Sequence, residues 1–129
     1  MKTTYLYILL ALVVVIVFVF IRNNSNGSKS EMITPYDTFA QCLSDAGAKF
    51  YGAYWCPHCQ AQKKLFENST KLPYIECSTP NGQAQTQICI DKKITGYPTW
   101  EFADGSRGNG EQTFAQLAEK TKCPLPQVP

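Results

Sequence analysis

Hydrophobic and polar positions divide the chain into an apolar N-terminal run, a polar segment and a patterned remainder. Residues 5–21 carry no charged side chain, and as a helix they span roughly 25 Å. That length is at the short end for crossing the hydrocarbon layer of about 30 Å. The pattern therefore predicts a membrane helix in residues 1–22, a flexible linker in 23–34, a folded domain in 35–123 and a short tail in 124–129.

The apolar run has a second interpretation, a signal peptide that is cleaved after export. Such a peptide has an apolar core of about 7–15 residues followed by small residues at the cleavage site, which Ser25-Asn26-Gly27 matches loosely. We favour an uncleaved, single-pass anchor because the run is long and stays β-branched and aromatic to its end. The flanking charges do not fix the orientation. We expect the domain on the extracytoplasmic side because its cysteines suit an oxidising compartment.

Apolar positions in the domain follow helical spacing in some segments and strand spacing in others. Spacing of i, i+3, i+4 and i+7 predicts helices after Thr34 and from Phe114 to Thr121, and a further helix begins near Pro57. A weaker pattern predicts a helix over 83–93, and short apolar runs predict strands over 48–54, 73–77, 99–103 and 106–109. Asp104-Gly105 is typical of a hairpin turn. This order predicts an α/β fold with a mixed four-stranded sheet and helices on both faces.

Charge excludes one class of function. The formal net charge is +2, but Lys2, Arg22 and Lys29 precede residue 30, and every acidic residue follows it. The domain therefore has a slight negative excess. Proteins that bind nucleic acids usually neutralise phosphates with a basic surface, so we expect no nucleic-acid partner.

Two of the six cysteines, Cys56 and Cys59, flank Pro57 and His58 where a predicted strand meets a predicted helix. Backbone N–H groups and the helix dipole stabilise an anion there, which favours the thiolate of Cys56 as a nucleophile. Pro57 suits the first helical position, and a charged His58 adds a second stabilising interaction. Cys59, one turn on, is expected to be more buried and to resolve a mixed disulfide at Cys56.

The other four cysteines leave alternatives open. We expect Cys77 and Cys89 to form a structural disulfide, with a second redox relay as the alternative. Cys42 and Cys123 can be paired only by elimination, and two free thiols are a comparable alternative. Structural zinc needs four ligands, and the chain has one histidine and no second Cys-x-x-C. No metal is therefore expected, although zinc and an inert disulfide are the competing interpretations of the motif itself.

Three segments resemble the thioredoxin-like domain that accompanies vitamin K epoxide reductase-type membrane oxidoreductases: Phe50-Tyr51-Gly52-Ala53-Tyr54-Trp55-Cys56-Pro57-His58-Cys59-Gln60, Pro73-Tyr74-Ile75-Glu76-Cys77 and Tyr97-Pro98-Thr99-Trp100-Glu101-Phe102. The likeness covers about residues 38–120, and Cys-Pro-His-Cys is also the tetrapeptide of DsbA, a periplasmic oxidase. The resemblance implies a thioredoxin-like fold and a cis-proline at Pro98 that faces the active-site disulfide. It also implies that Tyr97 presents its backbone to an extended substrate segment. Trp55 is expected to pack beside the site and to bind substrate together with Tyr97 and Pro98.

The chain departs from the family pattern in two places. Fused members contain a quinone-reducing helical bundle, whereas this chain has one predicted anchor, so a quinone-linked membrane oxidoreductase is expected to act in trans. Thioredoxin has a buried aspartate six residues before its first active-site cysteine, and Phe50 occupies that position here. A base for Cys59 is not evident from the sequence, although Glu76 or Glu101 could serve if either faces inward. Lys63-Lys64 is expected on a solvated helix face.

The function predicted from these features is that of a membrane-anchored thiol-disulfide oxidoreductase without a cofactor. It would form or exchange disulfides in exported cysteine-containing proteins and be reoxidised by a membrane partner. One alternative is the same chemistry in reverse, a reductase fed with electrons across the membrane. The other is a non-catalytic thioredoxin-like module that binds a metal or a partner protein.

Overall fold

The computed structural model describes residues 2–24 and 33–127, in two compact units that divide after residue 32. The first unit contains one helix, α1 (Lys2–Asn24). Its segment Thr3–Phe20 has a mean hydropathy of 2.7 and is long and apolar enough to cross a membrane, although an N-terminal signal sequence has the same properties. Most of the predicted linker and the candidate cleavage site at 25–27 lie outside the described residues.

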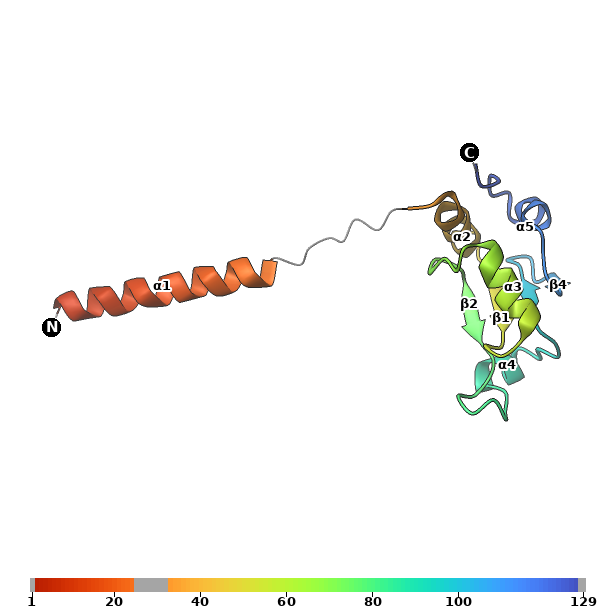
Figure 1. Cartoon of the computed structure of the whole chain (residues 1–129), viewed down its shortest axis with the longest axis horizontal. Helices are drawn as coiled ribbons and strands as arrows, with labels where there is room; N and C mark the ends of the chain where they lie inside the picture. The colour runs from red at the N-terminus through yellow and green to blue at the C-terminus, as the bar shows by residue number, and fades with distance from the viewer. Residues whose placement is uncertain (1, 25–32, 128–129) are drawn as a thin grey trace. The chain divides into compact units, whose positions relative to one another are not determined.

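The second unit contains four helices and four strands among its described residues (Figure 1). In chain order these are α2 (Pro35–Asp45), β1 (Lys49–Gly52), α3 (Pro57–Leu65), β2 (Tyr74–Glu76), α4 (Gln87–Asp91), β3 (Thr99–Glu101), β4 (Arg107–Asn109) and α5 (Phe114–Thr121). The strands form one sheet in the order β2-β1-β3-β4. β2 is parallel to β1, whereas β1–β3 and β3–β4 are antiparallel. A parallel pair needs a crossover, and α3 lies in that connection.

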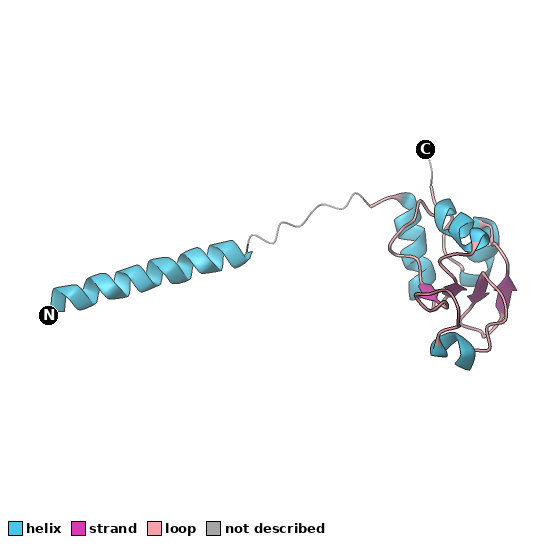
Figure 2. Ribbon diagram, turned by 60° about the horizontal axis from the view of Figure 1, so that its bottom comes forward, coloured by secondary structure: helices cyan, strands magenta, loops and turns pink. Residues whose placement is uncertain are grey.

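The two faces of the sheet are covered by different helices (Figure 2). Consecutive side chains of a strand point to opposite faces, so Phe50 and Tyr51 of β1 enter different hydrophobic clusters. Phe50 stacks on Trp100 of β3 at 4.9 Å between ring centroids, in a cluster that includes residues of α2, α3 and α5. Tyr51 packs with Cys89 of α4. These contacts confirm the mixed four-stranded α/β fold with helices on both faces.

Capping residues fix the N-terminal ends of the first and last helices of the domain. Thr34 Oγ1 accepts the backbone N–H of Asp37 at 3.1 Å, and Asp37 Oδ2 accepts the N–H of Thr34 at 2.9 Å. Thr113 and Gln116 form the same reciprocal pair at the start of α5. Such pairs satisfy backbone donors that a helix leaves unbonded. Both helices accordingly begin where the sequence predicts.

The helix predicted over 83–93 is shorter than expected, because α4 begins only at Gln87. The preceding residues form a loop in which the Thr79 N–H donates to the Ala84 carbonyl. Gly82 lies in this loop with φ of +72°, a left-handed conformation that glycine adopts without steric cost. The loop closes before the helix starts, which explains the weak periodicity of this segment.

Two disulfides cross-link the domain. Cys42 of α2 is bonded to Cys123, 81 residues later and just beyond α5. The sequence leaves open whether these two cysteines pair or are free thiols, and the structure shows that they pair. Cys77, the residue after β2, is bonded to Cys89 of α4, 12 residues later. The second bond closes the loop that precedes α4.

Candidate active site

Cys56 and Cys59 are free thiols at the beginning of α3. Cys56 is the N-cap residue and Pro57 follows at the first helical position. The Cys56 side chain makes no capping hydrogen bond, and its Sγ lies 3.7 Å from the carbonyl oxygen of Tyr97. Cys56 is 6% exposed and Cys59 1%. The predicted pair therefore lies at the helix start, and Cys59 is the more buried of the two.

Tyr97 and Pro98 form the wall of the site opposite α3. The peptide bond between them is cis, and Pro98 is buried directly before β3. The carbonyl of Tyr97 faces the sulfur of Cys56. The structure thus brings together residues 56, 97 and 98, and the substrate-binding role that the resemblance implies for Tyr97 and Pro98 stays a prediction.

Trp55 lies next to Tyr97, with its ring edge-on to the tyrosine ring at 6.0 Å between centroids. Its Nε1 donates to Ser78 Oγ at 2.8 Å, and half of the residue remains exposed. Gln85 Nε2 in turn donates to the Tyr97 hydroxyl at 2.7 Å. A hollow of about 190 Å³ opens among these side chains and the 82–84 loop. No sequence pattern singles out Ser78 or Gln85, because their contacts arise from folding of the loop that the Cys77–Cys89 bond closes.

His58 has a partner that sequence reasoning missed. Its Nδ1 lies 2.7 Å from Glu111 Oε1, and the two side chains are 70% and 47% exposed. Glu111 lies 53 residues later, in the segment before α5. Exposed pairs of this kind stabilise a fold by at most about 1 kcal/mol. The pair nevertheless places a carboxylate beside the histidine of the motif.

The surroundings of Cys59 keep its thiol protonated. Burial raises the pKa of Cys59 to about 12. Gly52 of β1 makes room for the sulfur, because a Cβ there would lie 2.9 Å from Cys59 Sγ and 2.8 Å from Tyr74 Cε2. Phe50 packs edge-on against the Tyr74 ring at 5.1 Å between centroids. Phe50 occupies the position of the thioredoxin aspartate, so an aromatic ring stands there in place of a carboxylate.

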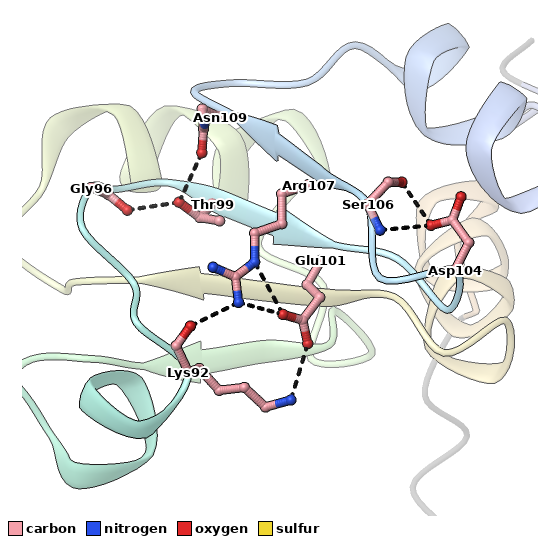
Figure 3. A network of polar contacts seen from close by, with 8 residues as sticks. All are labelled: Lys92, Gly96, Thr99, Glu101, Asp104, Ser106, Arg107 and Asn109. Atoms are coloured by element: carbon pink, nitrogen blue, oxygen red, sulfur yellow. Dashed lines mark hydrogen bonds and ion pairs between the residues drawn. The ribbon is translucent and has the colours of Figure 1, made fainter.

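Glu101 does not serve as the base considered for Cys59. It accepts from Arg107 at 2.7 and 3.1 Å and from Lys92 at 3.3 Å, in a polar network on β3 and β4 (Figure 3). Although burial opposes the effect, hydrogen bonds from Arg107 and then Lys92 lower the pKa of Glu101. The carboxylate is thus committed to these cations, and the expectation for Glu101 is wrong.

Glu76 and Lys63 both contact Tyr74, whose ring borders the buried cysteine. Glu76 Oε2 accepts the Tyr74 hydroxyl at 2.7 Å, and Glu76 Oε1 accepts the backbone N–H groups of Tyr54 and Ser78. Lys63 is half-buried, with its Nζ 3.2 Å from the centroid of the Tyr74 ring. The expectation of a solvated helix face is therefore wrong for Lys63.

The chain is similar to two proteins whose names indicate thioredoxin-type domains or thiol-disulfide exchange. No family model matches the chain. The chain is 40% identical over 105 residues to thiol-disulfide oxidoreductase LTO1 of Arabidopsis thaliana, covering 77% of this chain and 28% of that protein. It is 31% identical over 102 residues to the thioredoxin domain-containing protein 5 homolog of Drosophila melanogaster, covering 69% and 24%.

The chain thus spans about a quarter of the length of each of these two relatives. Together with the mixed sheet and the position of the cysteine pair, the relatives define a thioredoxin-like domain. Among residues 2–24 and 33–127, no group of three or more His, Cys, Asp or Glu side chains is arranged to hold a metal ion.

Proposed function

We propose that this protein is a thiol-disulfide oxidoreductase that acts through Cys56 and Cys59 on exported cysteine-containing proteins. The observation that carries the proposal is the state of the cysteines. Four of them form two disulfides, whereas Cys56 and Cys59 remain free thiols at the beginning of α3. Such a pair can cycle between thiols and disulfide while the rest of the fold stays cross-linked.

The geometry supports different roles for the two sulfurs. A substrate thiolate would attack Cys56 Sγ in the oxidised pair, form a mixed disulfide and displace the sulfur of Cys59. Cys56 suits this role because its sulfur faces the Tyr97 backbone, along which an extended peptide would lie. A second substrate thiolate would then attack the mixed disulfide, which leaves the substrate oxidised and Cys56 and Cys59 reduced.

The proposed anchor and partner rest on the N-terminal segment. We assign α1 as a single-pass anchor with the domain on the extracytoplasmic side, where an oxidising compartment suits two structural disulfides. Tethering at the membrane would raise the effective concentration of the domain near other membrane proteins. Reoxidation is assigned to a quinone-linked membrane oxidoreductase in trans.

The direction of electron flow is tested by the redox potential. The full chain in detergent is equilibrated with glutathione buffers, and the fraction of oxidised Cys56/Cys59 is measured by alkylation. An oxidase is expected to have a potential nearer about −120 mV, the value for DsbA, than about −270 mV, the value for thioredoxin. A potential near the thioredoxin value would support the reductase instead.

Substrates and partner are tested by trapping mixed disulfides with a Cys59→Ala variant in cells. The variant is expected to retain exported proteins and the reoxidising membrane protein on Cys56, and a Cys56→Ala/Cys59→Ala variant is expected to retain neither. Alkylation of reduced wild-type protein near pH 6 tests whether a couple exists at all. If Cys56 is inert there, the non-catalytic module replaces the enzyme.

A further inference from the structure

Lys63 is half-buried one helical turn after the buried thiol of Cys59, and we propose that it carries the proton that Cys59 takes up or releases during disulfide exchange. This inference rests on the proposed function and adds a residue to it. Lys63 follows Cys59 by four residues in α3, so both side chains lie on the same face of the helix. Lys64, the next residue, is exposed.

The Tyr74 ring holds the amine of Lys63 against the sheet. Lys63 Nζ lies 3.2 Å from the ring centroid, a geometry in which the aromatic face attracts a cation. The Cε2 edge of the same ring and Cys59 Sγ border the same space above Gly52, at 2.8 and 2.9 Å from the place of a Cβ. One aromatic ring thus lies beside both the sulfur and the amine.

A hollow of about 320 Å³ gives the amine access to water. Its lining includes Lys63 and Tyr74 together with Asn68 and Thr70, which are both exposed. Cys59 itself is 1% exposed. Of the two groups, Lys63 is therefore the one that can exchange a proton with solvent.

The proton affinities of the two groups suit a transfer from amine to sulfur. Burial raises the pKa of Cys59 to about 12. Burial lowers the pKa of Lys63, and the charges of Glu76 and then Cys59 act against this shift. An ammonium group with a pKa below that of the thiol protonates the thiolate favourably.

The other groups that face this cluster come from α3, β1 and β2. β2 contributes Tyr74 and Glu76, and burial, followed by the hydrogen bond to Glu76, raises the pKa of Tyr74. Tyr74 therefore stays protonated and donates to Glu76 at 2.7 Å. α3 contributes Cys56, which forms the mixed disulfide, and β1 contributes Phe50 and Gly52, which do not titrate.

Proton transfer between Lys63 and Cys59 accompanies the exchange of the disulfide bond. When a substrate thiolate bonds to Cys56 Sγ, the Cys56–Cys59 bond breaks and its electron pair stays on Cys59. The ammonium of Lys63 donates a proton to that thiolate, and the resulting amine takes a proton from water in the hollow. In the reverse direction the amine accepts the Cys59 proton, and the thiolate attacks Cys56 in the mixed disulfide.

A two-phase reaction with an aromatic disulfide, dithiobis(nitrobenzoic acid), tests the proposal on the full chain in detergent. Reduced Cys56 releases the first thionitrobenzoate, and attack by Cys59 releases the second, so stopped-flow absorbance separates the steps. Lys63→Met is expected to slow the second phase about tenfold or more near pH 8 and to change the first less than twofold. The second phase of the variant is also expected to keep rising with pH where that of the wild type levels off.

Two further variants separate the loss of a positive charge from the loss of a proton carrier. Lys64→Met removes an exposed charge from the same helix and is expected to leave both phases unchanged. An unchanged second phase in Lys63→Met, or a wild-type second phase in Lys63→Arg, which keeps the charge but does not release a proton at these pH values, would overturn the proposal. Absence of a second phase in the wild type would instead contradict the proposed function.

Discussion

The sulfur of Cys56 lies 3.7 Å from the carbonyl oxygen of Tyr97, although 41 residues separate them. The contact joins the beginning of α3 to the residue pair that precedes β3. Both sides are held in place, Cys56 as the N-cap residue and Tyr97 through its hydroxyl bond to Gln85. A reactive sulfur next to a fixed backbone carbonyl is the arrangement on which the proposed peptide chemistry depends.

Trp55 is expected to contribute to peptide binding at this surface. Trp55→Ala removes a half-exposed ring that packs against Tyr97, so the KM for a cysteine-containing peptide should rise severalfold while kcat changes little. The rate with glutathione, which is too small to cover the ring, should stay within about twofold. Leu65→Ala, which truncates an exposed apolar residue at the end of α3, is the control. Equal effects of Trp55→Ala on peptide and glutathione would contradict the assignment.

His58 is expected to make the couple more oxidising. His58→Gln removes a group that can carry positive charge next to the anion-stabilising helix start, so the reduced form should lose stability relative to the disulfide. The potential should become more negative by roughly 30–60 mV, at about 30 mV for each tenfold change in equilibrium. Equilibration with glutathione measures the shift, and Lys64→Met controls for the loss of a cation. An unchanged potential would contradict the electrostatic role.

The two disulfides are expected to differ in their effect on stability. Loop-closure entropy gives roughly 4.5 kcal/mol for the Cys42–Cys123 bond, with a sequence separation of 81, and roughly 3 kcal/mol for Cys77–Cys89, with a separation of 12. Urea unfolding of the two double-alanine variants, each with Cys56 and Cys59 oxidised, measures the losses. A larger loss for Cys77–Cys89 would show that local packing outweighs chain entropy here.

Gly52 is expected to tolerate no side chain. A Cβ at this residue would lie 2.8 Å from Tyr74 Cε2 and 2.9 Å from Cys59 Sγ, so Gly52→Ala must displace a packed ring or the buried sulfur. Such overpacking costs about 1–3 kcal/mol of unfolding free energy. Gly96→Ala is the matched control, because nothing lies within 4 Å of its Cβ position. Equal urea midpoints for the two variants would refute the crowding.

Asp37 is expected to link stability to pH at the acidic end. Hydrogen bonds from Ser69 and then Thr34 lower the pKa of Asp37 from 3.8. A lowered folded-state pKa adds stability above the unfolded value, and this stability is lost as the pH falls through the folded value.

Asp37→Asn should therefore cost about 1 kcal/mol at pH 7, typical of a lost cap interaction, and much less near pH 2. Asp45→Asn, at the other end of α2, is the control for the loss of a carboxylate from this helix. Urea midpoints at both pH values provide the measurement. A cost for Asp37→Asn that is the same at both would contradict the linkage.

Local sequence patterns were sufficient to predict the helices and strands and the place of the redox-active cysteine pair. Helical spacing predicts α2 and α5, with Thr34 as the N-cap of α2, because these interactions act over three or four residues. The start of α3 at Cys56 is also predicted from neighbouring residues, since Pro57 suits the first helical position. The helix predicted over 83–93 begins later, at Gln87, because the preceding residues are held by the Ser78–Gln85 bridge and the Cys77–Cys89 disulfide, which leave little periodic signal.

The sequence by itself determined the apolar run, the order of strands and helices, and a cysteine pair at a helix start, because each depends on neighbouring residues. Tertiary structure alone decided the pairing of Cys42 with Cys123, the partnership of His58 with Glu111 and the place of Lys63 on the Tyr74 ring. The first two contacts join side chains that lie 81 and 53 residues apart in the chain. Burial and partner choice depend on how the sheet and helices pack, and no short window of sequence contains that information.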